Sequence, residues 1–454
     1  MAADAHDNEQ ARSSARPWYL LVAVLVLLIA GSLVLRHIRA GSQLQARLDA
    51  IRAAGYPATC AELNDWYAIP PDANNAADLV IKAFGYYNLS QYIGNPNLPV
   101  FGPAELPARG EPLDHSTRLL IGKCLADNRQ ALEFLHAAAQ VPHGRYPVDF
   151  SLGLNTLMPY LPDVRKGARL LALEAVWHAD ADRPSEAADA IIAIMGLAQS
   201  LSKEPTLMSQ LVRLAIQRQA IDVLEYAASR VEFTAKRLRQ LQTALRRAED
   251  PNAMTRALVG ERCFGLWCFQ APQALPLAIN LLGTGSVSKP RLLLYKLLGS
   301  KDADINSYLD IMDAYIRATT LPLAERRRAA VEAEKLLINI PKTHILTRIL
   351  LPAMNRVIEV EMRRIAQVRA ARAALAVQRY RLARGRLPEW LSQLVGEYLD
   401  AVPTDPFDGK PLRYKKLDKG FVVYSIGEDG RDDGGKEKSP GRYEDYDVTF
   451  IVER

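Results

Sequence analysis

Three phrases in the C-terminal part of the chain decide its fold, and they read YRLARGRLP at residues 380–388, PTDPFDGKPLRY at residues 403–414 and GFVVYSIGEDGRDDGG at residues 420–435. Gly385 follows an arginine-rich helical pattern, and a glycine at this place permits a left-handed helix cap. Pro406 and Gly409 are typical of a turn, because proline presets φ and glycine allows a positive φ. The order predicts a helix end, a turn-rich connector, a strand and an acidic glycine-rich loop.

The end of the chain has the composition of a small antiparallel sheet. Three runs alternate in polarity or are rich in β-branched and aromatic residues, and they cover residues 412–416, 421–426 and 447–452. We expect a short helix over residues 388–398 before them. These elements together predict a C-terminal α+β module over residues 385–454.

Upstream of this module, residues 113–384 are predicted to form one helix after another. Aromatic residues make up only 7% of the chain, while alanine, leucine and arginine are abundant, and this mixture favours helices. The expected helices cover residues 114–140, 163–180, 185–202, 206–230, 234–249, 252–269, 303–319, 322–338 and 345–384. No repeat of tetratricopeptide length recurs, so we expect helical hairpins packed in a bundle or array. The predicted fold class is therefore mainly α.

Near the N-terminus, residues 18–35 read WYLLVAVLVLLIAGSLVL and carry no charge. A helix of this length spans roughly 27 Å, close to the thickness of the hydrocarbon layer of a bilayer. Trp18 and Tyr19 suit the membrane interface, and Arg36 ends the run. A cleaved signal peptide is the alternative, but the run is long for one and lacks a small-residue cleavage site. We therefore predict a retained transmembrane helix.

Two sequence signals disagree about the orientation of this anchor in the membrane. Counting charges on its two flanks favours the C-terminal side inside the cell, and a cytosol-facing adaptor is thus one alternative. Short N-terminal tails of signal-anchor proteins usually stay in the cytoplasm, so we expect the bulk of the chain outside it. The predicted organisation is a tail at residues 1–17, the anchor at 18–35, a membrane-proximal helix and irregular segment at 36–112, the helical domain at 113–384 and the module at 385–454.

Composition and motifs argue against several classes of function. The net charge of +6 is modest, and no basic stripe alternates with aromatic residues, so we do not expect nucleic-acid binding. The seven histidines form no HExxH motif, and phosphate-loop, nucleophile-elbow and dinucleotide-binding motifs are missing from the sequence. We therefore expect a protein that is not an enzyme. The alternative is an envelope enzyme with its site in the helical domain.

The chain has four cysteines, and an even number allows two disulfides in an oxidising compartment. They are Cys60, Cys124, Cys263 and Cys268. We favour the interpretation that all four are small buried residues.

The C-terminal phrases resemble the major pseudopilin of type II secretion systems. In that family a Tyr-Arg-Leu phrase ends a long helix, an Asp-Pro turn follows, and a Tyr-Ser strand leads to an acidic glycine-rich loop. The whole chain also resembles a group of bacterial membrane-anchored helical proteins that share the Gly55-Tyr-Pro57 phrase, a resemblance that implies no activity. The chain departs from pseudopilins because it has no processing site before its apolar run and carries a long helical insert.

The pseudopilin resemblance implies a calcium site in the terminal loop. Asp429, Asp445 and Asp447 match the family's positions, and the backbone carbonyl of Ile426 is a fourth donor. Further candidates in the same loop are Asp432 and Asp433. Calcium prefers several such oxygens on a sharply turning loop. The alternative is a solvated acidic turn that binds no metal.

These observations predict a single-pass protein of the bacterial inner membrane that acts as a structural or interaction scaffold. The resemblance connects it to a secretion or surface-assembly apparatus, with calcium stabilising the terminal loop. We expect a protein partner, whose identity the residues do not encode.

Overall fold

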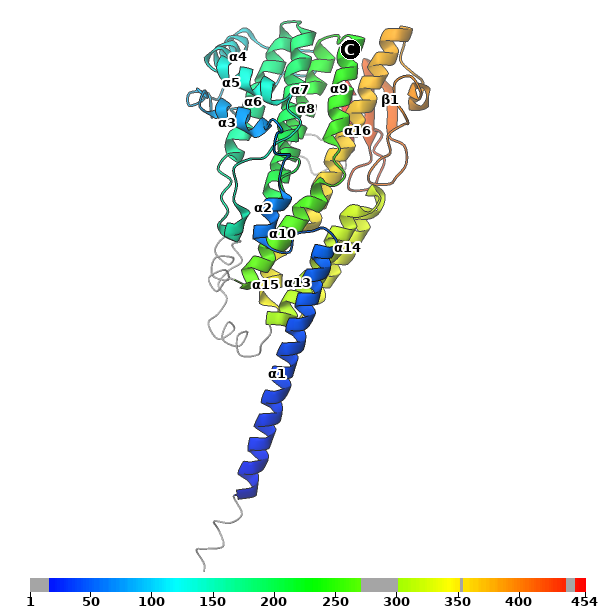
Figure 1. Ribbon diagram of the computed structural model, residues 1–454. Helices are drawn as coiled ribbons and strands as arrows, with labels where there is room; N and C mark the ends of the chain where they lie inside the picture. Colours follow the sequence, from blue (N-terminus) through cyan, green and yellow to red (C-terminus); the bar gives the residue numbers. More distant parts are fainter. Residues whose placement is uncertain (1–15, 271–300, 352–353, 438–445) are drawn as a thin grey trace, which may run out of the picture.

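A computed structural model of the chain describes residues 16–270, 301–351, 354–437 and 446–454 (Figure 1). These residues form a helical body from which one long helix projects, with a small sheet beside the last helix. The expectation of a mainly α fold with a small antiparallel sheet is confirmed.

The first helix, α1, runs over Arg16–Ala53, and its N-terminal half extends away from the body (Figure 1). Its C-terminal half packs against α13 through Leu48 and Ile51, which belong to the same core cluster as helix α13. Within the parts of the chain that the structure describes, no helix combines the length and the apolarity that a membrane span requires. The anchor at residues 18–35 is therefore not confirmed and stays a prediction.

The membrane-proximal segment contains more helix than the sequence predicted. As expected, Thr59 caps α2 (Cys60–Trp66), because its hydroxyl accepts the backbone N–H of Glu62 at 3.2 Å. The expectation of irregular structure from residue 69 onward is wrong over α3 (Ala76–Phe84). The side chain of Asn75 caps α3, and the apolar spacing inside this short helix was hidden by the surrounding proline, asparagine and glycine residues.

The body is built from helices that follow one another along the chain. They are α4 (His115–Asp127), α5 (Arg129–Ala138), η2 (Phe150–Asn155, a 3₁₀ helix), α6 (Leu161–Asp180), α7 (Pro184–Ser200), α8 (Leu207–Arg230), α9 (Ala235–Ala248), α10 (Ala253–Gln270), α13 (Lys301–Thr320), α14 (Leu323–Asn339), α15 (Ile345–Leu350) and α16 (Met354–Arg384). Neighbours such as α6 and α7 or α13 and α14 pack as hairpins, as predicted. Ala187 and Ala188 are fully buried where α7 meets its neighbours, because small side chains let helix axes approach closely.

Two predicted helices are each divided in the structure. The helix expected over residues 114–140 breaks at Asn128, whose side chain donates to the carbonyls of Cys124 at 2.8 Å and Asn88 at 3.1 Å. Asparagine competes with the helix for backbone hydrogen bonds in this way. The helix expected over residues 345–384 becomes α15 and α16, on either side of residue 351.

The C-terminal strands lie on α16. They are β1 (Arg413–Leu417), β2 (Gly420–Ser425) and β3 (Val448–Val452), paired antiparallel in the order β1-β2-β3. Phe421 on β2 pairs with Lys416 on β1 and Val452 on β3. The predicted strands are confirmed, whereas the helix expected over residues 388–398 is only the 3₁₀ turn η3 (Leu391–Leu394).

The sheet and the helices share one hydrophobic core. Leu375 of α16, Phe421 of β2 and Phe450 of β3 are fully buried members of the same cluster. Gly385 ends α16 at φ +68°, and Gly409 turns the connector at φ +73°, as the sequence predicted. The C-terminal module therefore packs as an integral layer on α16 and α8.

Candidate functional site

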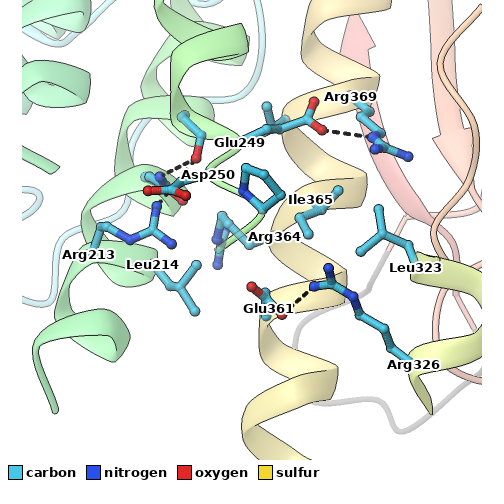
Figure 2. A pocket seen from close by; sticks show the side chains of 14 residues that line it. Arg213, Leu214, Glu249, Asp250, Leu323, Arg326, Glu361, Arg364, Ile365 and Arg369 are labelled. Atoms are coloured by element: carbon cyan, nitrogen blue, oxygen red, sulfur yellow. Dashed lines mark hydrogen bonds and ion pairs between the residues drawn. The ribbon is translucent and has the colours of Figure 1, made fainter. Parts of the chain in front are cut away.

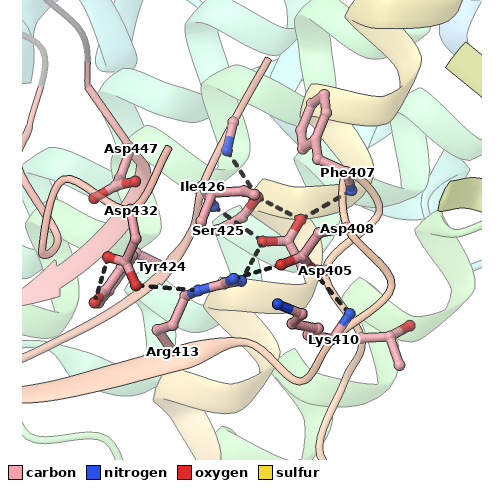
Figure 3. Close-up of polar contacts among 12 residues, drawn as sticks. Asp405, Phe407, Asp408, Lys410, Arg413, Tyr424, Ser425, Ile426, Asp432 and Asp447 are labelled. Carbon is pink, nitrogen blue, oxygen red and sulfur yellow. Dashed lines mark hydrogen bonds and ion pairs between the residues drawn. The ribbon is translucent and has the colours of Figure 1, made fainter. Parts of the chain in front are cut away.

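The connector between α16 and the sheet is held by one buried carboxylate, that of Asp405 (Figure 3). It accepts the backbone N–H of Phe407 and of Ile426, both at 2.9 Å, and the hydroxyl of Ser425 at 2.8 Å. Arg413 on β1 donates to the same carboxylate at 2.8 Å. Asp405 thus fastens the turn to the ends of two strands.

Sequence analysis treated this stretch as turn chemistry alone and missed the role of Asp405. Its partners at residues 425 and 426 lie twenty positions further along the chain, so no local pattern announces them. Arg413 extends the network to Asp408 at 2.5 Å and to Asp432 at 3.5 Å (Figure 3). The acidic loop is therefore tied to the connector through one guanidinium.

The predicted calcium ligands are held by hydrogen bonds within their own loop. The buried carboxylate of Asp447 accepts the N–H of Gly435 at 2.7 Å and that of Asp433 at 3.4 Å. Asp432 accepts the hydroxyl of Tyr424 at 3.1 Å. Asp429 accepts a neighbouring backbone N–H, that of Arg431, at 3.1 Å.

The loop brings some of the predicted ligands together and leaves others apart. Burial raises the pKa of Asp447, and the negative charges of Asp433 and Asp432 raise it further, against the hydrogen bonds from the N–H groups of Gly435 and Asp433 that lower it. One oxygen of Asp433 is buried without a hydrogen-bond partner. Among the described residues, Asp429 forms no hydrogen bond with another predicted ligand, and Asp445 lies outside these residues.

No three acidic, histidine or cysteine side chains among the described residues, which exclude 438–445, form a group that could hold a metal ion. Asp432, Asp433 and Asp447 carry the carboxylate oxygens that calcium prefers, but their side chains do not come together as a metal-binding group, and calcium usually takes six to eight ligands. The calcium site stays a prediction.

A cavity of about 210 Å³ lies in the helical body, where sequence analysis proposed no site (Figure 2). Its walls come from α8, from the turn between α9 and α10, and from α14 and α16. Leu214, Leu323 and Ile365 give it apolar walls, while four arginines and three acidic residues also line it. The charged lining residues are Arg213, Arg326, Arg364, Arg369, Glu249, Asp250 and Glu361.

Every carboxylate of this lining forms an ion pair with an arginine. Glu361 pairs with Arg326 at 3.2 Å. Glu249 pairs with Arg369 and Arg372, both at 3.0 Å, and Asp250 pairs with Arg256. Burial nevertheless raises the pKa of Glu361, against the positive charges of Arg326 and Arg213 that lower it.

The signal for this cavity was present in α16. Glu361, Arg364, Ile365 and Val368 recur at spacings of three, four and seven and so share one helix face, which lines the cavity. Charged residues at helical spacing usually lie on a solvated helix face. Arg364 is instead buried, with 5% of its side chain exposed.

Two further polar clusters bear on the enzyme alternative. Glu204 is fully buried in the body and accepts the hydroxyls of Tyr67 at 3.3 Å, Ser209 at 2.5 Å and Tyr160. His136 pairs with Glu174 across α5 and α6 at 2.7 Å. Burial lowers the pKa of His136, but the hydrogen bond and charge of Glu174 outweigh this and raise it. His136 therefore joins α5 to α6.

The four cysteines are buried and unpaired, as predicted. Burial raises the pKa of each thiol, so all four are poor nucleophiles at neutral pH.

Known proteins provide no template for this fold or for these sites. No protein-family model, no curated protein and no solved structure matches this chain.

Proposed function

We propose that the protein is a membrane-anchored scaffold of the bacterial envelope. The observation that supports this function is the exposure of residues 18–28 of α1. Trp18, Leu21, Leu25 and Leu28 are between 57% and 68% exposed on a helix that leaves the body (Figure 1). Exposed apolar surface of this extent is costly in water and is typical of a surface that is covered by a membrane or a partner.

The rest of α1 joins the apolar segment firmly to the body. Arg47 forms ion pairs with Asp310 at 2.9 Å and Asp313 at 3.3 Å on α13, and its guanidinium donates to the side chain of Asn306 at 3.2 Å. Leu48 and Ile51 pack into the core beside it. A body attached in this way is held at a fixed distance and angle from the membrane, which suits a scaffold.

In this proposal the N-terminal tail faces the cytoplasm and the body lies outside it. A protein partner binds the body, and the resemblance of the C-terminal phrases to pseudopilins connects the scaffold with secretion or surface assembly. The enzyme alternative has its best candidate in the arginine-lined cavity. Each carboxylate there already forms an ion pair with an arginine.

Cell fractionation tests the anchor. We expect the intact protein in the membrane fraction, released by detergent but not by alkaline carbonate. The double variant Leu21→Glu and Leu25→Glu should move to the soluble fraction, because charged residues are expensive inside a bilayer. Leu119→Glu serves as the control, since Leu119 is similarly exposed, at 60%, on helix α4 of the body. Recovery of the unmodified protein in the soluble fraction without detergent would refute the proposal.

Calcium binding by the acidic loop is tested separately with the full-length protein. We expect calcium to raise the melting temperature and a chelator to reverse this, because the cation relieves repulsion among Asp432, Asp433 and Asp447. Asp447→Asn should abolish the difference, while Asp429→Asn should weaken it less. Identical melting curves with calcium and with chelator would remove calcium from the account.

A further inference from the structure

Two arginines beside the cavity are buried without a carboxylate partner. Arg213 is 2% exposed and Arg364 is 5% exposed. Among the described residues, no carboxylate oxygen lies within 4.0 Å of either guanidinium. Every acidic residue of the cavity wall already pairs with another arginine. Burying an unpaired charge costs free energy, and two such charges lie beside this one cavity.

The neutral hydrogen bonds of these two arginines leave donors unused. Arg213 donates to the side chain of Gln210 at 2.6 Å and to the carbonyl of Ala248 at 3.3 Å. Arg364 donates to the side chain of Gln367, and its Nε is buried with no acceptor. A guanidinium has five N–H donors, and those that face the cavity are available to an anion.

The surroundings of Arg364 keep its charge poorly compensated. Burial lowers its pKa to about 9, and the positive charges of Arg218 and Arg363 act in the same direction, against the attraction of Asp222. Burial also lowers the pKa of Arg213, and the carboxylates of Glu361 and Asp250, which do not form an ion pair with it, raise this pKa. Both guanidinium groups belong to residues that line the cavity between α8 and α16, and neither has an ion-pair partner among the described residues (Figure 2).

The remaining wall restricts the kind of anion that fits. Leu214, Leu323, Ile365 and Val368 line the cavity with aliphatic groups. An apolar cavity of roughly 150 Å³ accommodates a molecule as large as benzene, so a volume of about 210 Å³ has room for a ring or branched chain with one acidic group. Inorganic phosphate would fill only the polar end and leave the aliphatic wall uncovered.

We propose that this cavity binds a small organic carboxylate whose acidic group contacts Arg213 and Arg364 and whose apolar part lies against Leu214, Ile365 and Val368. The planar guanidinium group matches a carboxylate with two parallel hydrogen bonds. This ligand site is independent of the membrane anchor and of the calcium loop, so a negative result for either of them does not affect it.

Calorimetric titration of the full-length protein in detergent tests the site with benzoate as the probe. We expect saturable binding of benzoate, at least tenfold weaker binding of uncharged benzamide, and no comparable binding of inorganic phosphate. Arg364→Met should weaken benzoate binding by about ten- to a hundredfold, the loss typical of a charged hydrogen-bonded pair. Arg356→Met is the matched control, because Arg356 lies on the same helix and is 71% exposed.

A second variant distinguishes a loss of benzoate binding from a loss of folding. Leu214→Phe leaves both arginines in place and fills the cavity, so it should abolish benzoate binding while the protein keeps its helical circular dichroism. The proposal is wrong if benzoate does not bind, if Arg364→Met and Arg356→Met bind it equally well, or if Leu214→Phe binds it unchanged. Tighter binding of phosphate or equal binding of benzamide would also contradict it.

Discussion

At the scale of single residues, Asp405 carries more of the C-terminal structure than its place in a turn suggests. One fully buried carboxylate joins the connector, the end of β2 and Arg413 of β1 through four contacts. Such a group is stabilising only while its partners are present, because an unpaired buried charge or donor costs free energy. Replacing it therefore affects three segments at once.

Asp405→Asn is expected to lower the free energy of unfolding by about 3 kcal/mol, since the amide cannot accept from all of these donors and leaves Arg413 less well paired. Asp408→Asn is the control, because Asp408 lies at the edge of the same network and accepts from Lys410 and Arg413. It should cost about 1 kcal/mol. Denaturant unfolding of both variants makes the comparison, and equal losses would refute the central role of Asp405.

Glu225 on α8 makes the attachment of β3 depend on pH. Its carboxylate accepts the N–H of Ile451 at 2.8 Å and lies 3.1 Å from Arg109. Burial raises the pKa of Glu225 from 4.5 to about 7, and the charges of Glu437 and Asp222 add to this, while Arg109 and the N–H of Ile451 oppose it.

The folded state therefore binds the Glu225 proton more tightly than the unfolded chain does. Its contribution to stability is complete below pH 4.5 and is lost as the pH rises through 7. Relative to Glu225→Gln, which mimics the protonated acid, the wild type should lose about 3 kcal/mol across this window. Unfolding measured at pH 4.5, 6 and 8 checks this, and a constant difference between the two proteins would contradict it.

At the scale of elements, α16 connects the parts of the molecule. It packs on α8, α9 and α14 and carries β2 and β3 on another side. Its alanines, among them Ala370, Ala371 and Ala374, are fully buried and let these neighbours approach closely. One face of the same helix forms a wall of the cavity. Disturbing its centre should therefore weaken both the helical body and the sheet.

Leu375→Ala is expected to lower the free energy of unfolding by between about 2 and 5 kcal/mol, because Leu375 is fully buried and its removal leaves a cavity. Leu382→Ala provides the comparison on the same helix. Leu382 is 39% exposed, and its replacement should change stability by less than about 1 kcal/mol. Similar losses in both variants would show that α16 is not the central element.

Periodicity and turn residues were enough to predict most elements of this fold. The strands, the cap at Gly385 and the hairpin arrangement of the helices follow from local signals. The missed features depend on distant partners. Asn128, where a helix breaks, donates to the distant carbonyl of Asn88, and Arg364 is buried on a face of α16 that lines a cavity together with residues of α8 and α14. The arginine-lined cavity also forms between helices that are far apart in the sequence, so no local pattern predicts it.

At the scale of the whole molecule, the account rests on a projecting helix joined rigidly to a helical body with a small sheet (Figure 1). The exposed apolar half of α1 is the feature that a bilayer would cover. The ion pairs of Arg47 with Asp310 and Asp313 on α13 fix the position of α1 relative to the body. The residues that line the cavity come from α8, the turn between α9 and α10, α14 and α16, and α1 contributes none of them.

The depth of Leu25 in a bilayer tests this account most directly. The four native cysteines are buried, so a fluorescent label can be placed selectively on Leu25→Cys, with Leu119→Cys on the body as the reference. In vesicles whose lipids carry bromine near the middle of their acyl chains, we predict strong quenching of the label at residue 25 and none at residue 119. Equal fluorescence of the two labels, with and without brominated lipid, would contradict the account.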